Sequence, residues 1–136
     1  DILACRAQVA SRYNEALGEL SWLRRPSTPT GYVHGNQAYV CLFAPDEPTP
    51  SNVEILSRAR SDLMRSLEQA GIATRQGTHA PVLADYYARK YSIRPEQYPN
   101  AWLAEGLSLA LPLYPQMTLE EQYFVCEMLA EFGADL

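Results

Sequence analysis

The fold is decided by four segments in the second half of the chain: GIATRQGTHAPV (residues 71–82), YYARKY (86–91), YPNA (98–101) and LSLALPLYPQMT (107–118). In the last of them, Leu107, Leu109 and Leu111 alternate with smaller residues, which predicts a strand with one face in the core. Pro99 suits the first position of a short helix, and residues 81–91 predict another that exposes its basic end. The block therefore predicts short helices that lead into a strand.

A longer helix is expected immediately before this block, over residues 51–70. Ser51 and Glu54 have capping-box spacing, in which each side chain satisfies the other residue's free backbone N–H. Gly71 stands where a left-handed C-terminal cap is expected, and Ile72 can fold back on the last turn. The buried stripe predicted for this helix consists of Leu56, Ala59, Leu63, Leu67 and Ala70.

Two more helices and a strand complete the expected fold. Residues 2–23 carry an apolar stripe at helical spacing, and the apolar run AYVCLFA at residues 38–44 is typical of a strand buried on both faces. Prolines and glycine exclude a regular element over residues 24–32. Thr118 and Glu121 form a second capping box at the start of a final helix. The expected fold class is α+β, a small antiparallel or mixed sheet covered by helices, in one domain.

Composition excludes several classes of protein. Hydrophobic residues make up 47% of the chain and charged residues 20%, which is typical of a soluble globular domain. A net charge of −5 with scattered basic residues disfavours a nucleic-acid or polybasic membrane surface. No apolar run approaches the ~20 residues that span a bilayer. The three cysteines, Cys5, Cys41 and Cys126, are expected to be buried thiols in the cytoplasm.

Histidine is scarce, and the pattern around it offers no metal site. The two histidines, His34 and His79, have no cysteine or carboxylate at ligand spacing. The sequence also has no nucleophile elbow and no Gly-rich phosphate loop. His79 follows a predicted strand end, where binding loops are commonly built, but a turn histidine bonded to backbone explains it as well.

The order and spacing of the four segments resemble the C-terminal small domain of the DegT/StrS-type aminotransferases, pyridoxal-phosphate enzymes of fold type I that act on nucleotide-linked sugars. The resemblance covers most of the chain and is strongest from Gly71 to Thr118. It implies a connector helix at 1–23 and an α+β core at 33–136. It also implies a fragment of a longer, homodimeric enzyme, whose missing N-terminal large domain holds pyridoxal phosphate. The chain alone is then expected to bind no cofactor and to be inactive.

The resemblance also implies which residues shape the substrate site. A histidine at the position of His79 commonly lies in a loop that reaches an active site, often that of the neighbouring subunit. Arg75 could grip the phosphate of a sugar nucleotide with a bidentate fork, although a solvated strand-end arginine is an equal alternative. One of Tyr86 and Tyr87 is expected in the core and the other facing a ligand. His34 begins the strand-opening segment HGNQAY and is the weakest of these substrate-binding candidates.

Lys90 and Val82 limit what the resemblance implies. Lys90 is the only lysine among eleven basic residues, so it is the only possible Schiff-base attachment point in this chain. It follows Arg89 on a polar stretch, whereas the family places its cofactor lysine in the large domain. We therefore expect no catalytic residue here. Many relatives have a second histidine where this chain has Val82, which predicts a more apolar substrate pocket.

Two other functions remain open at this stage. A stand-alone binding or oligomerisation module without catalysis would suit the arginine-rich, acidic composition. A related pyridoxal-phosphate-dependent sugar dehydratase would share the fold. Such relatives replace the cofactor lysine by histidine, and because this chain does not contain that position, its residues do not decide between the two activities. An upstream reading frame with a cofactor lysine would exclude the first alternative.

Overall fold

The computed structural model describes residues 1–134 and contains five α-helices and one sheet. The helices are α1 (Ile2–Ala16), α2 (Val53–Gln69), α3 (Asp85–Tyr91), α4 (Pro99–Leu107) and α5 (Leu119–Phe132). Two short 3₁₀ helices are η1 (Pro81–Leu83) and η2 (Pro95–Gln97). The strands β1 (Leu23–Arg24), β2 (Tyr39–Phe43) and β3 (Ser108–Leu111) form an antiparallel sheet in the order β1-β2-β3. The α+β prediction is thereby confirmed.

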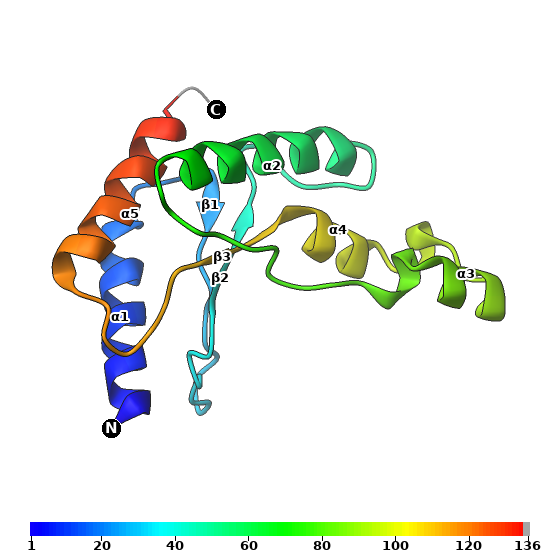
Figure 1. Cartoon of the computed structure of the whole chain (residues 1–136). Helices are drawn as coiled ribbons and strands as arrows, with labels where there is room; N and C mark the ends of the chain where they lie inside the picture. The colour runs from blue at the N-terminus through cyan, green and yellow to red at the C-terminus, as the bar shows by residue number, and fades with distance from the viewer. Residues whose placement is uncertain (135–136) are drawn as a thin grey trace.

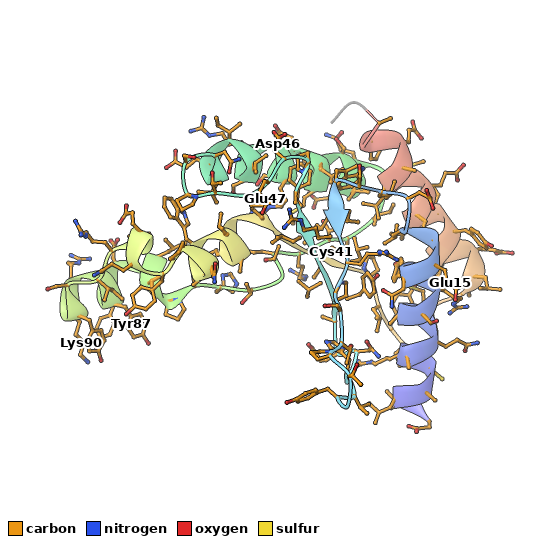
Figure 2. All side chains as sticks on the ribbon, turned by 180° about the vertical axis from the view of Figure 1, so that it is seen from behind. Glu15, Cys41, Asp46, Glu47, Tyr87 and Lys90 are labelled. Atoms are coloured by element: carbon orange, nitrogen blue, oxygen red, sulfur yellow. The ribbon has the colours of Figure 1, made fainter. Side chains whose placement is uncertain are left out.

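The helices form a body around the sheet, and one segment projects from it (Figure 1). α1 and α5 pack side by side, and α2 packs against α5 and α4. Residues 81–98, comprising η1, α3 and η2, form an arm that extends away from the sheet, and α4 leads back to it. Figure 2 shows Tyr87 and Lys90 at the tip of this arm. The arm therefore stands clear of the body that contains the core.

β2 is the central strand of the sheet, and its register places Cys41 opposite Leu109 of β3. Beyond β3, Arg75 extends the sheet by one isolated antiparallel bridge to Ala110. The Ala110 N–H donates to the Arg75 carbonyl at 2.7 Å, and the Arg75 N–H donates back at 3.2 Å. The segment that follows the cap at Gly71 thus joins the sheet through a single bridge.

Two buried tyrosines join α1 to the sheet and to the loop after it. The rings of Tyr13 and Tyr39 lie 4.9 Å apart between centroids, and both side chains are almost fully buried. The Tyr13 hydroxyl donates to the Pro112 carbonyl at 2.9 Å, and the Tyr39 hydroxyl donates to Asn14 Oδ1 at 2.7 Å. Burial raises the pKa of both phenols. Because both hydroxyls are paired, the core tolerates them.

Two helix boundaries follow the sequence prediction closely. Gly71 has φ +84°, and the Ile72 N–H donates to the Leu67 carbonyl at 2.8 Å, so the left-handed cap of α2 is confirmed. At the start of α5, Thr118 Oγ1 accepts the Glu121 N–H at 3.1 Å, and Glu121 Oε2 accepts the Thr118 N–H at 2.8 Å. The second capping box is confirmed as well.

Other boundaries differ from the prediction. α1 ends at Ala16, well short of residue 23, because the chain turns there to bring Leu23 into β1. That two-residue strand was not predicted. The capping box at the start of α2 is wrong: Asn52 is the cap residue, and its Oδ1 accepts the Thr49 N–H of the preceding turn at 2.8 Å.

Burial also departs from the prediction on one face of the sheet. Val40 and Leu42 of β2 are only half-buried, so the strand is not buried on both faces. Cys41 is buried between them, whereas Cys5 and Cys126 are half-buried. Among residues 1–134, no helix is both long enough and apolar enough to cross a membrane.

Candidate functional site

Ser108 fixes the backbone of the loop that carries His79, here called the His79 loop (residues 76–81). Its Oγ atom accepts hydrogen bonds from the N–H groups of Gly77 and Thr78, both at 3.1 Å. Ser108 is the first residue of β3 and only 4% exposed. A buried hydroxyl that accepts two backbone N–H groups leaves neither donor unpaired. The loop is therefore tied directly to the sheet.

Glu105 and Gly77 complete this attachment. The Glu105 carboxylate, on α4, accepts the N–H of buried Ala80. A Cβ atom added to Gly77 would lie 2.3 Å from Val40 Cγ1 and 3.0 Å from Ser108 Cβ. Glycine is required at this position, because any side chain would overlap the sheet. The loop is thus held by hydrogen bonds near both ends and packed against the sheet at Gly77.

His79 itself is exposed at the surface of this fixed loop. Its Nδ1 atom lies 3.2 Å from Gln76 Nε2, which also donates to the Thr78 carbonyl at 2.7 Å. An amide nitrogen only donates hydrogen bonds, so His79 Nδ1 accepts in this pair. The neutral ring then carries its proton on Nε2. That nitrogen can donate a hydrogen bond to a ligand.

Arg75 precedes the His79 loop and lines a groove of about 460 Å³ against α2. Arg60 and Arg65 of α2 line the same groove, and so does Gln76. Gln76 therefore contacts the ring of His79 and also borders the groove that contains Arg75. Arg75 and His79, both predicted to bind substrate, therefore lie close together on one short segment beside this groove.

Tyr86 and Tyr87 lie on α3, the helix at the tip of the arm (Figure 1). Their side chains are 60% and 41% exposed, so the prediction that one of them belongs to the core is wrong. The two rings meet edge to face at 5.2 Å, and Tyr87 stacks on Tyr91 at 6.2 Å. Lys90 donates to the Tyr86 hydroxyl at 2.9 Å. These residues form an exposed aromatic surface.

His34 belongs to the loop between β1 and β2, and this loop lies well away from the arm (Figure 1). Its Nδ1 atom accepts the Asn36 N–H at 2.9 Å, and Asn36 adopts φ +45°. This geometry is that of a turn histidine bonded to local backbone. Within residues 1–134, the five predicted site residues therefore occupy three separate places: the Arg75–His79 segment, the arm and this turn.

The described part of the chain was also compared with the requirements of a metal site and of a reactive thiol. Over residues 1–134, no three His, Cys, Asp or Glu side chains gather in a way that could hold a metal ion. Burial raises the pKa of Cys41 to about 12 and that of Cys126 to about 11. Thiols with such values are almost entirely protonated near neutral pH and are poor nucleophiles.

Ser108, Glu105 and Arg60 were not predicted from the sequence as site residues. Ser108 reaches Gly77 across 31 residues of sequence, and Glu105 reaches Ala80 across 25. In the alternation of β3, Ser108 falls on the face opposite the leucines, where a polar residue is ordinary, so residue spacing carried no signal of its burial. A buried polar side chain needs a hydrogen-bond partner, but the sequence does not indicate which one.

Several solved structures share this fold. A Streptococcus pneumoniae protein described as a sugar aminotransferase, Spr1654, matches 98% of the chain with a TM-score of 0.82 and 18% identity. Helicobacter pylori PseC, an aminotransferase involved in the biosynthesis of pseudoaminic acid, matches 99% with a TM-score of 0.79 and 12% identity. NtdA of Bacillus subtilis, solved with bound PMP, matches 98% with a TM-score of 0.74 and 23% identity.

The fold is therefore that of one part of an aminotransferase. The chain spans about a third of the length of these structures, with 31%, 33% and 28% of them covered. It belongs to the DegT/DnrJ/EryC1/StrS aminotransferase family, whose model matches residues 1–130. The family resemblance noted from the sequence is confirmed. No curated protein sequence matches the chain.

Proposed function

We propose that this chain is the C-terminal small domain of a pyridoxal-phosphate-dependent aminotransferase that acts on a nucleotide-linked keto-sugar. Its task is to shape the substrate site. Family membership and the one-third coverage of the aminotransferase structures support this proposal. The observation that carries it is the His79 loop, whose backbone is held by Ser108 and Glu105 while the ring of His79 stays exposed. A fixed backbone under an exposed donor is typical of a binding loop.

The cofactor would supply the electron sink for amino-group transfer. Lys90 does not fit the role of its anchor. The ammonium of Lys90 is exposed on the arm, 5.2 Å from the ring centroid of Tyr86 and 5.4 Å from that of Tyr91. A Schiff-base lysine requires desolvation or a neighbouring cationic group inside a pocket. We therefore assign the anchor to a large domain outside this chain. From the family resemblance, we also propose that the active enzyme is a homodimer.

In this arrangement the residues of the chain bind and orient the sugar nucleotide. His79 would donate from Nε2 to a sugar oxygen, and Arg75 would pair its guanidinium fork with a phosphate. Neither residue would move a proton in the reaction. Their contribution would therefore appear mainly in the binding of the sugar nucleotide, with the amino donor unaffected.

Steady-state kinetics of the full-length enzyme test this role. We expect His79→Ala to raise KM for the sugar nucleotide about 3- to 10-fold, because that is the loss of binding affinity expected when one hydrogen bond is removed. The single-turnover reaction with the amino donor alone should be unchanged. Gln116→Ala, at another exposed polar loop position, serves as the control. Unchanged sugar-nucleotide kinetics in the His79 variant would count against the proposal.

A further inference from the structure

The arm, residues 81–98, contains three helical elements but no buried residue. Its α-helix, α3, has only seven residues, and helices shorter than about 12 residues are marginal in water without tertiary packing. Four tyrosines of the arm are 41–60% exposed: Tyr86, Tyr87, Tyr91 and Tyr98. Tyrosine and arginine are enriched where proteins contact one another. The arm therefore has the composition of a contact surface but packs no side chain into the core of this chain.

Side chains at the tip of the arm are ordered by one another. The ammonium group of Lys90 donates to the Tyr86 hydroxyl at 2.9 Å and lies 5.4 Å from the ring centroid of Tyr91. The ring of Tyr87 stacks on that of Tyr91. Because these contacts restrict the side chains before a partner binds, binding would cost less conformational entropy. Tyrosine also offers a large contact area with few rotatable bonds.

The arm is basic, although the chain is acidic. It has three basic side chains, Arg89, Lys90 and Arg94, against two acidic ones, whereas the whole chain has a formal net charge of −5. Arg89 pairs with Asp85 at 3.3 Å, and both of these side chains are exposed. Among residues 1–134, no ion pair includes Lys90 or Arg94. A partner that complements the arm should therefore offer carboxylates together with aromatic side chains.

The outer face of α5, here called the acidic face, has this chemistry. Glu120, Tyr123, Glu127 and Glu131 follow one another at steps of three and four residues, so they share one side of the helix, and Phe124 lies beside them. All five side chains are exposed, that of Tyr123 by 72%. The helix contains no basic residue, and no ion pair within residues 1–134 includes its glutamates. The acidic face thus complements the arm in charge and shares its aromatic character.

The acidic face has a hollow on each flank. The hollow toward α1 has a volume of about 250 Å³ and is lined by Leu119 and Tyr123 of α5 and by Arg12 and Glu15 of α1, among others. The hollow on the other flank, of about 430 Å³, is lined largely by apolar residues and by Phe124. Aromatic side chains that enter such pockets supply much of the binding energy at many interfaces. The hollows are therefore suited to receive tyrosine rings.

The arm and α5 lie at opposite ends of the molecule (Figure 1), so the arm cannot reach the acidic face of its own chain. We propose that the arm of one copy of this chain docks on the acidic face of a second copy, and that the second copy's arm docks in return. A twofold axis between the copies produces both contacts at once. The inference rests on the homodimer proposed above and names its contacting surfaces. Neither surface includes Arg75 or His79, so its failure would leave the result of the His79 assay unaffected.

Sedimentation velocity of the chain over a range of concentrations tests this contact. We expect a monomer–dimer equilibrium, with the dissociation constant raised about tenfold or more in Tyr86→Ala and in Tyr123→Ala, because each substitution removes two symmetry-related contacts. Tyr32→Ala is the matched control, since Tyr32 is 75% exposed in the loop between β1 and β2, outside both surfaces. It should associate like the unaltered chain. All three side chains are exposed, so the variants should fold, which circular dichroism checks.

Charge reversal tests the reciprocal arrangement. Lys90→Glu and Glu127→Lys should each weaken self-association, because each substitution places like charges in both contacts. An equimolar mixture of these two variants should recover dimers, since a mixed dimer has opposite charges in both of its contacts.

Three results would overturn the proposal. The first is a chain that stays monomeric at every concentration. The second is equal weakening in Tyr86→Ala and Tyr32→Ala, because the dimer would then form through another surface. The third is a mixture of Lys90→Glu and Glu127→Lys that associates no better than either variant alone, because the arm would then not pair with α5.

Discussion

Gly77 and Val40 lie so close together that a Cβ atom on the glycine would be 2.3 Å from Val40 Cγ1. Val40 belongs to the central strand β2, and Gly77 lies in the His79 loop. The loop therefore rests directly on the sheet, and the sheet sets the position of His79. Packing at Gly77 and hydrogen bonding at Ser108 act on the same few residues of backbone.

Replacing Gly77 by alanine should both destabilise the chain and displace the His79 loop. The added methyl group overlaps a strand side chain, and such overpacking typically costs about 1–3 kcal/mol. Chemical denaturation measures the loss of unfolding free energy. Gly35→Ala is the matched control, because an added Cβ there would meet nothing within 4 Å; it should change stability by less than about 0.5 kcal/mol. Equal effects of the two variants would contradict the close approach.

Replacing Ser108 by alanine should release the His79 loop with little change in the size of the side chain. The Gly77 and Thr78 N–H groups lose their acceptor, and each part-buried hydrogen bond of this kind contributes about 0.5–1.5 kcal/mol. Amide hydrogen exchange should accelerate at Gly77 and Thr78 beyond the change expected from global stability. Ser11→Ala, on the exposed side of α1, is the control. Unaltered exchange at both amides would show that Ser108 does not hold the loop.

The capping box of α5 should make stability depend on pH in the acid range. The Thr118 N–H, the Tyr114 hydroxyl and the Thr118 hydroxyl donate hydrogen bonds that hold the pKa of the Glu121 carboxyl below its ordinary value of 4.5. A lowered pKa stabilises the folded chain above the ordinary value, and the contribution is lost as the pH falls through the folded-state value.

Thermal melting of the unaltered chain and of Glu121→Gln as a function of pH tests this dependence. Glutamine keeps an acceptor for the Thr118 N–H but does not titrate. The difference in Tm between the two proteins should therefore be constant near neutral pH and should shrink below pH 4.5. If the plots of Tm against pH for the two proteins stay parallel through the acid range, Glu121 does not make this contribution.

Alkylation should distinguish Cys41 from an ordinary thiol. It is buried in β2, and burial raises its pKa to about 12, so at mildly alkaline pH almost none of it is the reactive thiolate. Mass spectrometry after brief iodoacetamide treatment should find Cys41 unmodified in the folded chain and modified in denaturant. Rapid modification of Cys41 under native conditions would show that β2 is more accessible than the structure indicates.

The sequence predicted best those features that depend on near neighbours. The left-handed cap at Gly71 and the capping box of Thr118 and Glu121 are encoded within a few residues, and both are present. The capping box at Ser51 failed because the adjacent Asn52 takes the cap position and bonds to Thr49 in the preceding turn. A competing local hydrogen bond is not visible in residue spacing alone.

The candidate site was predicted only in part, for a physical reason. His79 and Arg75 could be selected from local pattern and family resemblance, but the groups that position or surround them come from α4, β3 and α2. Ser108 and Arg60 act through contacts between segments far apart in sequence. Residue spacing predicts what a short segment does, whereas the partner of a buried polar side chain depends on the tertiary arrangement.

Reductive trapping tests most directly whether this chain shapes a site without anchoring the cofactor. The chain is incubated with pyridoxal phosphate, reduced with borohydride and weighed by mass spectrometry, with Lys90→Arg as the control. We predict no stoichiometric adduct on the folded chain, because its single lysine lies exposed on the arm. Saturable addition of one phosphopyridoxyl group at Lys90, lost in the control variant, would contradict the assignment of the anchor to another domain.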